Sequence, residues 1–304
     1  MFPGVSPLFP GLETFALEIG PNVGQFVHAD PVVGELMLLN ATIHTAPPAR
    51  LRALVLAGLT LWPAFSAWSD PTAATLQALA SLELHFGFQA DQGIVHRMRA
   101  WDRAFTGPSS IGPPREPARE LGQWSLTHLV LSTSKEGRRY SAFPGMHDAS
   151  FPNLVSLRIS HMVFRHPDPP VPPTAPGTLE AFITRHPTLR TLVLDDCMLQ
   201  KDNVGGAYRP WAALCRALSQ ILTSLVHLSV YRHDVHAAAG MHDGAGVLVC
   251  LCGDFPIGYA SAPRGVFERS EIFYDPATAV RDMEALEALK DRVRDRAGRC
   301  CASR

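Results

Sequence analysis

A histidine- and aspartate-rich segment contains the side chains of this sequence best suited to metal or acid–base chemistry. The segment YRHDVHAAAGMHD places His233 and His236 three residues apart, close to Asp234, His242 and Asp243. Imidazoles and carboxylates together can bind zinc or activate a water molecule for hydrolysis. This spacing matches no established set of zinc ligands, and the Gly and Ala residues around it are typical of a solvated loop. A hydrolase with a loop-borne His/Asp site is therefore only an alternative prediction.

The cysteines also fail to match a metal site. All six lie toward the C-terminal end of the chain, at Cys197, Cys215, Cys250, Cys252, Cys300 and Cys301. Zinc-binding pairs usually have two to four residues between the cysteines, whereas these closely spaced pairs have one residue between them or none. A chain of this length does not need a disulfide framework, so we expect reduced thiols. The sequence also lacks a Gly-rich phosphate loop, a nucleophile elbow and a His-Glu-x-x-His helix. We predict a protein that is not an enzyme and binds no metal or cofactor.

The elements that would position polar side chains come from a repeated six-residue phrase, Leu-x-x-Leu-x-Leu. It begins at Leu51, Leu79, Leu126, Leu154, Leu189 and Leu225, with a looser copy at Leu12. The last two leucines lie two residues apart, which is the period of a strand with one buried face. Six or seven copies of one pattern indicate a repeat array. In the copy at Leu189, Cys197 stands where a thiol can satisfy backbone groups of the following turn.

Amphipathic segments between the phrases predict helices that return the chain to the next parallel strand. Residues 70–79, 178–187 and 211–225 carry apolar side chains at helical spacing, and Asp70 and Pro71 are typical of a helix start. Right-handed strand–helix–strand connections stack into a curved sheet. The sequence therefore predicts an α/β fold, an irregular leucine-rich-repeat solenoid with a curved parallel sheet lined by helices.

The phrases are spaced unevenly, and the extra length lies in insertions rich in Pro and Gly. These insertions are residues 105–123, 133–150 and 165–177. Because the phrase resumes after each of them, we interpret them as loops inside a single leucine-rich-repeat-like domain, 1–304. Its core repeats span about residues 50–235.

Residues 236–304 are predicted to form a C-terminal capping region. Two short apolar runs, 247–253 and 271–274, could be closing strands, and residues 276–296 are predicted to form an amphipathic helix. The side chains expected on its apolar face are those of Val280, Met283, Leu286, Leu289 and Val293. A solenoid needs such a helix to close its last repeat.

The residues between the leucines, together with the residue after the third leucine, should form three rows across neighbouring strands. Polar residues in these rows are expected on the concave face of the sheet, where solenoids usually bind their partners. The residues predicted to contact a protein partner are Glu83, His85, His128, Arg158, Asp195, His227 and Tyr231. Arg and Tyr are favoured as interface anchors.

Composition limits the classes of partner. The chain is 46% hydrophobic and 18% charged, with a formal net charge of −1. This profile is typical of a soluble globular protein, and it gives no electrostatic basis for binding nucleic acid or an anionic membrane. The first residues lack the basic start of a secretory signal, and the most apolar stretch, 51–65, is too short to span a membrane. We expect a cytoplasmic or nuclear protein.

Three segments, all within about residues 50–235, carry a resemblance to a known family. They are SFPNLVSLRISHMVF (150–164), GTLEAFITRHPTLRTLVLDDCML (177–199) and ILTSLVHLSV (221–230). In these segments the chain resembles the leucine-rich-repeat region of fungal F-box-like proteins. Members of that family are similar to substrate receptors of ubiquitin ligases, in which a short F-box binds the ligase adaptor and the repeats hold the target.

The resemblance implies a non-enzymatic scaffold for protein–protein interaction, serving as the substrate-recognition part of such a receptor. Residues 1–50 contain no Leu-Pro-x-Glu opening and no run of three short amphipathic helices. Adaptor binding is therefore expected only if an F-box lies upstream of residue 1. A truncated product without selected function is the remaining alternative.

Overall fold

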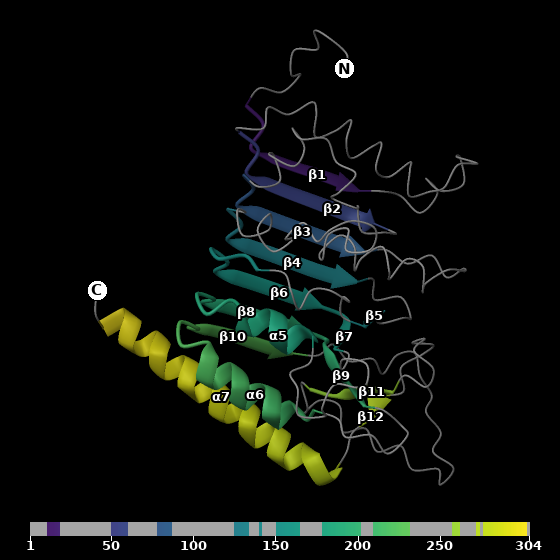
Figure 1. The fold of residues 1–304 in the computed structure, drawn as a ribbon, viewed down its shortest axis with the longest axis vertical. Coiled ribbons are helices and arrows are strands. Elements are labelled where there is room, and N and C mark those ends of the chain that lie inside the picture. Colours follow the sequence, from purple (N-terminus) through teal and green to yellow (C-terminus); the bar gives the residue numbers. More distant parts are fainter. Residues whose placement is uncertain are drawn as a thin grey trace, which may run out of the picture.

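The leucine phrases form adjacent strands of one parallel sheet in the computed structural model of this chain (Figure 1). The strands are β1 (Thr14–Glu18), β2 (Ala53–Leu59), β3 (Ser81–Phe86), β4 (His128–Thr133), β6 (Ser156–Ser160), β8 (Thr191–Asp195) and β10 (His227–Tyr231). They lie in the order β1-β2-β3-β4-β6-β8-β10, and each neighbouring pair is parallel. The predicted α/β class is confirmed, and the looser copy at Leu12 also supplies a strand.

The structure describes part of the chain. The described residues are 11–18, 50–59, 78–86, 125–133, 140–141, 150–164, 178–201, 209–231, 257–261, 272–273 and 276–302. Residues 70–77 of the helix expected at 70–79, the strand expected at 247–253 and the insertions 105–123 and 165–177 lie outside these residues.

Backbone hydrogen bonds set the register where each strand begins. The carbonyl of Arg52 accepts the N–H groups of both Ala80 and Ser81, at 2.8 and 3.0 Å, and the same double contact recurs between every adjacent pair of the seven strands. The accepting carbonyl belongs to the residue directly after the first leucine of a phrase. Successive strands are therefore held in one fixed alignment, which the leucine side chains share.

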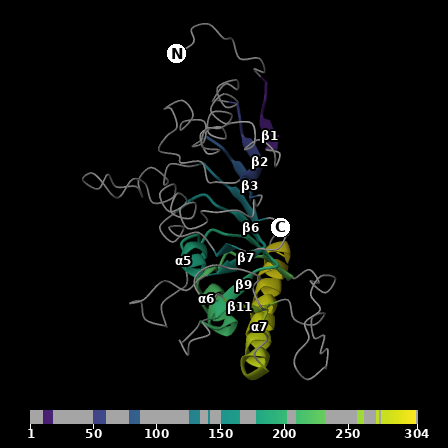
Figure 2. The same ribbon diagram turned by 90° about the vertical axis from the view of Figure 1, so that its right-hand side faces the viewer.

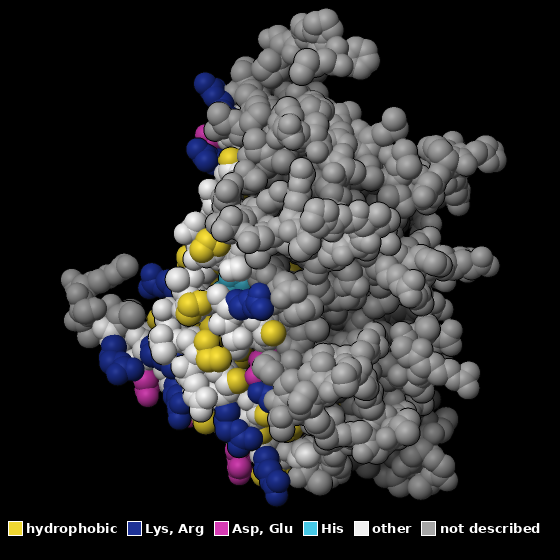
Figure 3. All heavy atoms as spheres, viewed as in Figure 1, with side chains coloured by type: hydrophobic (Ala, Val, Ile, Leu, Met, Phe, Trp, Pro, Cys, Tyr) yellow, Lys and Arg dark blue, Asp and Glu magenta, His cyan; other side chains and the backbone are white. Residues whose placement is uncertain are grey.

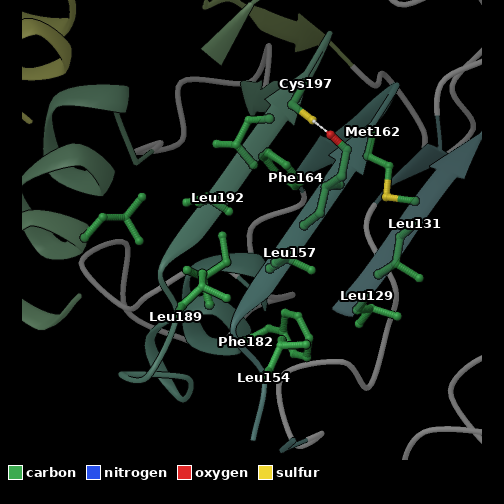
Figure 4. Close-up of a cluster of buried hydrophobic side chains, with 14 of the residues drawn as sticks. Leu129, Leu131, Leu154, Leu157, Met162, Phe164, Phe182, Leu189, Leu192 and Cys197 are labelled. Carbon is green, nitrogen blue, oxygen red and sulfur yellow. Dashed lines mark hydrogen bonds between the residues drawn. The ribbon is translucent and has the colours of Figure 1, made fainter. Parts of the chain in front are cut away.

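The leucines of all the phrases stack into a single hydrophobic core. The core leucines of β2, β3, β4, β6 and β8 are at most 3% exposed, as are the first leucines of the phrases from Leu51 to Leu225. Figure 4 shows leucine side chains of β4, β6 and β8 close to one another in this core. Burying a leucine side chain stabilises a protein by about 1.5–3 kcal/mol, so this core of stacked leucines is the main source of stability.

Cys197 has the role that its position in the phrase predicted. Its thiol donates hydrogen bonds to the carbonyl oxygens of Ile159, at 3.4 Å, and Asp195, at 3.5 Å (Figure 4). The side chain is 3% exposed, and burial raises the pKa of the thiol far above its ordinary value. Cys197 is therefore an unreactive structural thiol that links one repeat to the previous one.

A second, smaller sheet follows a sharp corner in the chain. His161 and Asp196, just after β6 and β8, adopt positive φ angles of 59° and 52°. The chain then enters the sheet β12-β11-β9-β7-β5, made of β5 (Tyr140–Ser141), β7 (Met162–Phe164), β9 (Met198–Lys201), β11 (Tyr259–Ser261) and β12 (Ile272–Phe273). The insertion 133–150 was predicted to be a loop, but β5 lies within it because Tyr140 and Ser141 pair with β7. β12 lies within the predicted closing strand 271–274.

Helices α5 (Thr178–Thr184) and α6 (Trp211–Ile221) lie on the same side of the seven-stranded sheet (Figures 1 and 2). Phe182 and Ile183 of α5 and the predicted apolar face of α6 are buried in the core. Arg209, just before α6, forms an ion pair with Glu180 of α5, so a charged contact as well as apolar packing connects the two helices.

Helix α7 (Pro276–Ala302) supplies polar groups to both ends of α6. Pro210, the N-cap of α6, makes no side-chain capping hydrogen bond. Instead the Ala212 N–H donates to Asp282 Oδ1 at 2.7 Å. At the other end, Arg296 donates to the carbonyl oxygens of Ser219 and Leu222, at 3.0 and 2.6 Å. A carboxylate at the N-terminus and a guanidinium at the C-terminus both match the dipole of α6.

The buried face of α7 differs from the prediction at one residue. Leu286, Leu289 and Val293 are buried, but Val280 is 62% exposed. Ala279 and Asp282 occupy the inner face instead, because Asp282 must reach the start of α6. Lys and Arg side chains follow α7 along the lower edge of the molecule in Figure 3. Among the described residues, no helix is both long and apolar enough to cross a membrane.

We expect acid to destabilise the fold through His186. Its Nε2 accepts from the Phe151 N–H at 2.9 Å and its Nδ1–H donates to the Phe182 carbonyl at 2.7 Å, so the neutral ring is required. Burial lowers the pKa of His186 to about 4, against about 6.5 in an unfolded chain. As pH falls from about 6.5 to 4 the unfolded state binds a proton that the folded state does not, which removes about 3 kcal/mol of stability.

This acid effect can be measured by urea unfolding between pH 7.5 and 4.5. His186→Gln should be less stable at neutral pH but lose less stability on acidification than the wild type. His227→Gln, at an exposed position, should keep the wild-type pH dependence. An unchanged pH dependence in His186→Gln would contradict the assignment.

We also expect Asp282→Ala to destabilise the protein by about 3 kcal/mol. Asp282 is 1% exposed and accepts hydrogen bonds from the Ala212 N–H and the Tyr259 hydroxyl, which would both lose a buried acceptor. Thermal and urea unfolding measure the loss. Asp291→Ala, on the exposed side of the same helix, should change stability by less than about 0.5 kcal/mol. Equal effects of the two substitutions would show that α7 does not cap α6.

Candidate functional site

The residues between the leucines, together with the residue after the third leucine, form three rows on the sheet face opposite the buried leucines. We call this surface the open face. In strand register, the first row includes Ser81, His128, Ser156, Thr191 and His227; the second Val55, Glu83, Val130, Arg158, Val193 and Ser229; the third His85, Ser132, Ser160, Asp195 and Tyr231. Because alternate residues of a strand point to opposite faces, these side chains are exposed or partly exposed. Ser160 and Asp195 are the exceptions and are buried. The predicted rows are therefore present.

One group of polar side chains, the arginine cluster, consists of Arg158, Ser160, Asp195 and Tyr231. Arg158 Nη2 donates to Asp195 Oδ2 and to the Tyr231 hydroxyl oxygen, both at 3.1 Å, while Arg158 Nε lies 3.4 Å from Ser160 Oγ. The Ser160 hydroxyl donates to Asp195 Oδ2 at 3.3 Å. Strands β6, β8 and β10 thus place side chains from three repeats around one guanidinium.

The arginine cluster combines a buried anion with an exposed cation. The side chain of Asp195 is 4% exposed, whereas that of Arg158 is 48% exposed. Asp195 therefore positions Arg158, and Arg158 is the group that a partner can reach. Burial, followed by the charge of Asp195, raises the pKa of Tyr231 above its ordinary value, while Arg158 acts in the opposite direction. Tyr231 remains a neutral phenol at physiological pH.

A second group, the histidine cluster, consists of Glu83, His85 and Ser132. His85 Nδ1 lies 2.6 Å from Ser132 Oγ, and His85 Nε2 lies 3.4 Å from Glu83 Oε2. Glu83 and His85 are partly exposed, with side-chain exposures of 38% and 36%. The imidazole thus bridges a hydroxyl on β4 and a carboxylate on its own strand.

The two other predicted residues belong to neither cluster. His128 Nδ1 lies 2.8 Å from Thr127 Oγ1, and His227 Nε2 lies 3.2 Å from Ser229 Oγ. Both rings are exposed on the first row. Ser132 and Ser160, which complete the clusters, were not among the predicted contacts. Their membership of the third row was the only signal, because serine is common on any protein surface.

The order Ser132–His85–Glu83 is one that hydrolases use to activate a serine nucleophile. Such catalysis also needs N–H donors directed at the oxyanion that forms. The backbones of β3 and β4 around these residues are paired in the parallel ladder, which uses their N–H groups. The arrangement is suited to holding Glu83 in place, and we do not assign it a reaction.

The loop-borne His/Asp site of the alternative prediction, with Cys250 and Cys252, lies outside the described residues. Among the residues that the structure does describe, no group of three His, Cys, Asp or Glu side chains could hold a metal ion. Comparison with known proteins finds no matching family model and no curated protein of significant sequence similarity.

We expect Arg158 and Asp195 to be energetically coupled. A double-mutant cycle with Arg158→Ala and Asp195→Asn should give a coupling of about 1 kcal/mol in urea unfolding, because the Asp195 side chain is buried while the Arg158 side chain is about half exposed to water. The pair Arg294 and Asp291, in which both side chains are more than half exposed, should give less than about 0.5 kcal/mol. A coupling near zero for the first pair would mean that Asp195 does not hold Arg158.

Proposed function

We propose that this protein is a non-enzymatic scaffold that holds a protein partner on its open face. We interpret the repeated strand, buried leucines and double backbone contact as an irregular leucine-rich-repeat solenoid. In such an array each repeat contributes one strand to a shared binding surface. A partner that binds this surface can then contact several repeats at once.

The observation that carries this proposal is that Arg158 is accessible to a partner and yet held in place by hydrogen bonds. Its side chain is about half exposed, yet its guanidinium is hydrogen-bonded by side chains from β6, β8 and β10. A long side chain held in this way loses less conformational entropy on binding than a free one. Arginine and tyrosine side chains are also enriched among the residues that dominate protein interfaces.

The particular function that we propose is target recognition by an F-box-like ubiquitin-ligase receptor in the cytoplasm or nucleus. The support is the resemblance of residues 150–164, 177–199 and 221–230 to that family, together with the open face. The repeats would hold the target, and an F-box upstream of residue 1 would bind the adaptor. The near-neutral charge favours a protein partner over nucleic acid.

Reversing the charge of Arg158 should reduce partner binding about tenfold or more. A photoreactive amino acid at Thr191, on the open face beside Arg158, would trap partners in the source cell, and quantitative mass spectrometry would compare wild type with Arg158→Glu. Arg216→Glu is the matched control, because Arg216 is exposed on α6, away from the open face. The same photoreactive group at position 216 should trap a different set of proteins.

The comparison requires that the variants stay folded, which circular dichroism and unfolding midpoints verify. Partners that cross-link equally to wild type and Arg158→Glu, or equally from positions 191 and 216, would contradict the proposal. Recovery of a ligase adaptor bound to the full-length gene product would test the receptor assignment separately.

A further inference from the structure

Apolar and charged residues alternate along the second row of the open face. Val55, Glu83, Val130, Arg158 and Val193 lie in register on the adjacent strands β2, β3, β4, β6 and β8. All five are exposed or partly exposed. The row therefore presents a negative and a positive side chain that are separated and flanked by valines.

The distances along this row are set by the sheet. Neighbouring strands lie about 4.8 Å apart, so Glu83 and Arg158, two strands apart, are about 10 Å from each other at their backbones. The valines lie midway, about 5 Å from each charged residue, and the row from Val55 to Val193 is about 19 Å long.

An α-helix fits this spacing and an extended segment does not. Seven helical residues advance about 10.5 Å and return to the same side of the helix, while three or four residues advance about 5 Å on that side. Residues of an extended strand that share a face are about 6.6 or 13 Å apart, and neither distance matches the charged pair. A helix of about 14 residues covers the whole row.

Both charged side chains are held in place by neighbours. His85 contacts Glu83 at 3.4 Å, and the arginine cluster holds Arg158 through Ser160, Asp195 and Tyr231. The positions of Glu83 and Arg158 are therefore defined before a partner binds, so the distance between these two opposite charges is fixed as well.

We propose that the partner docks an amphipathic α-helix across the strands, along the second row of the open face. Apolar residues seven apart on this helix cover the valines. A basic residue faces Glu83, and an acidic residue seven positions away faces Arg158. This inference rests on the proposed function and specifies the chemistry of the partner.

The test uses synthetic helical peptides of 21 residues with leucine at every seventh position. The first carries Lys and Glu seven residues apart on the leucine side, the second has the same composition with the two charges four residues apart, and the third carries Glu at both positions. Fluorescence anisotropy of labelled peptides should show the first binding wild-type protein about fivefold more tightly than either other peptide.

A single charge reversal in the protein gives the sharper result. In Glu83→Lys the row presents two positive charges, so this variant should prefer the Glu/Glu peptide by about fivefold. Exchanging both charges would be uninformative, because a helix can dock in the reverse direction. Glu284→Lys, at an exposed position of α7, makes the same change of net charge and should retain the wild-type preference.

Equal binding of the three peptides, no binding of any, or no change of preference in Glu83→Lys would overturn the docked helix. If a trapped natural partner still depends on Arg158, the proposed function stands and only the helix is wrong. If neither the peptides nor a natural partner responds to Arg158→Glu, both proposals fail.

Discussion

The fold depends on the register between neighbouring parallel strands. At the start of each strand, one backbone carbonyl accepts two N–H groups from the next strand, and this contact recurs along the whole sheet. Because side chains of a strand alternate between faces, a slip of one residue would move the leucines to the open face and bury the polar rows. The same register that builds the core therefore decides which polar side chains meet across the strands.

A stack of parallel strands leaves its last repeat uncovered, and α7 resolves this at β10. Leu286, Leu289 and Val293 of α7 join the core, beside the half-buried apolar side chains of β10. Polar side chains of α7 also bind the two ends of α6. Asp282 and Arg296 satisfy backbone groups that a local cap would otherwise bind. Helix α7 is thus integral to the fold, since α6 has no side-chain cap of its own at its start.

The open face acquires its character from charged side chains that neighbouring residues of the sheet hold in place. Asp195 is buried and holds Arg158, while His85 holds Glu83, so the exposed charges stand at positions determined by strand spacing. Between them lies Val130, which is apolar and partly exposed. A surface with fixed charges and apolar gaps is suited to recognising a regular structure, because the partner must match a distance as well as a composition.

The sequence alone determined the seven strands of the larger sheet, the parallel rows, the structural role of Cys197 and the C-terminal helix, because each follows from a local period or a position in the phrase. Tertiary structure decided the rest. The corner at His161 and Asp196, the pairing of β5 and the burial of Asp282 in place of Val280 depend on neighbours distant in the chain. The clusters needed it as well. Glu83, His85, Arg158, Asp195 and Tyr231 could be nominated by row, but only the side-chain contacts of the folded sheet, within and between strands, group them apart from His128 and His227 and add Ser132 and Ser160. A sequence pattern reports which face a side chain occupies; which side chains touch is decided by packing.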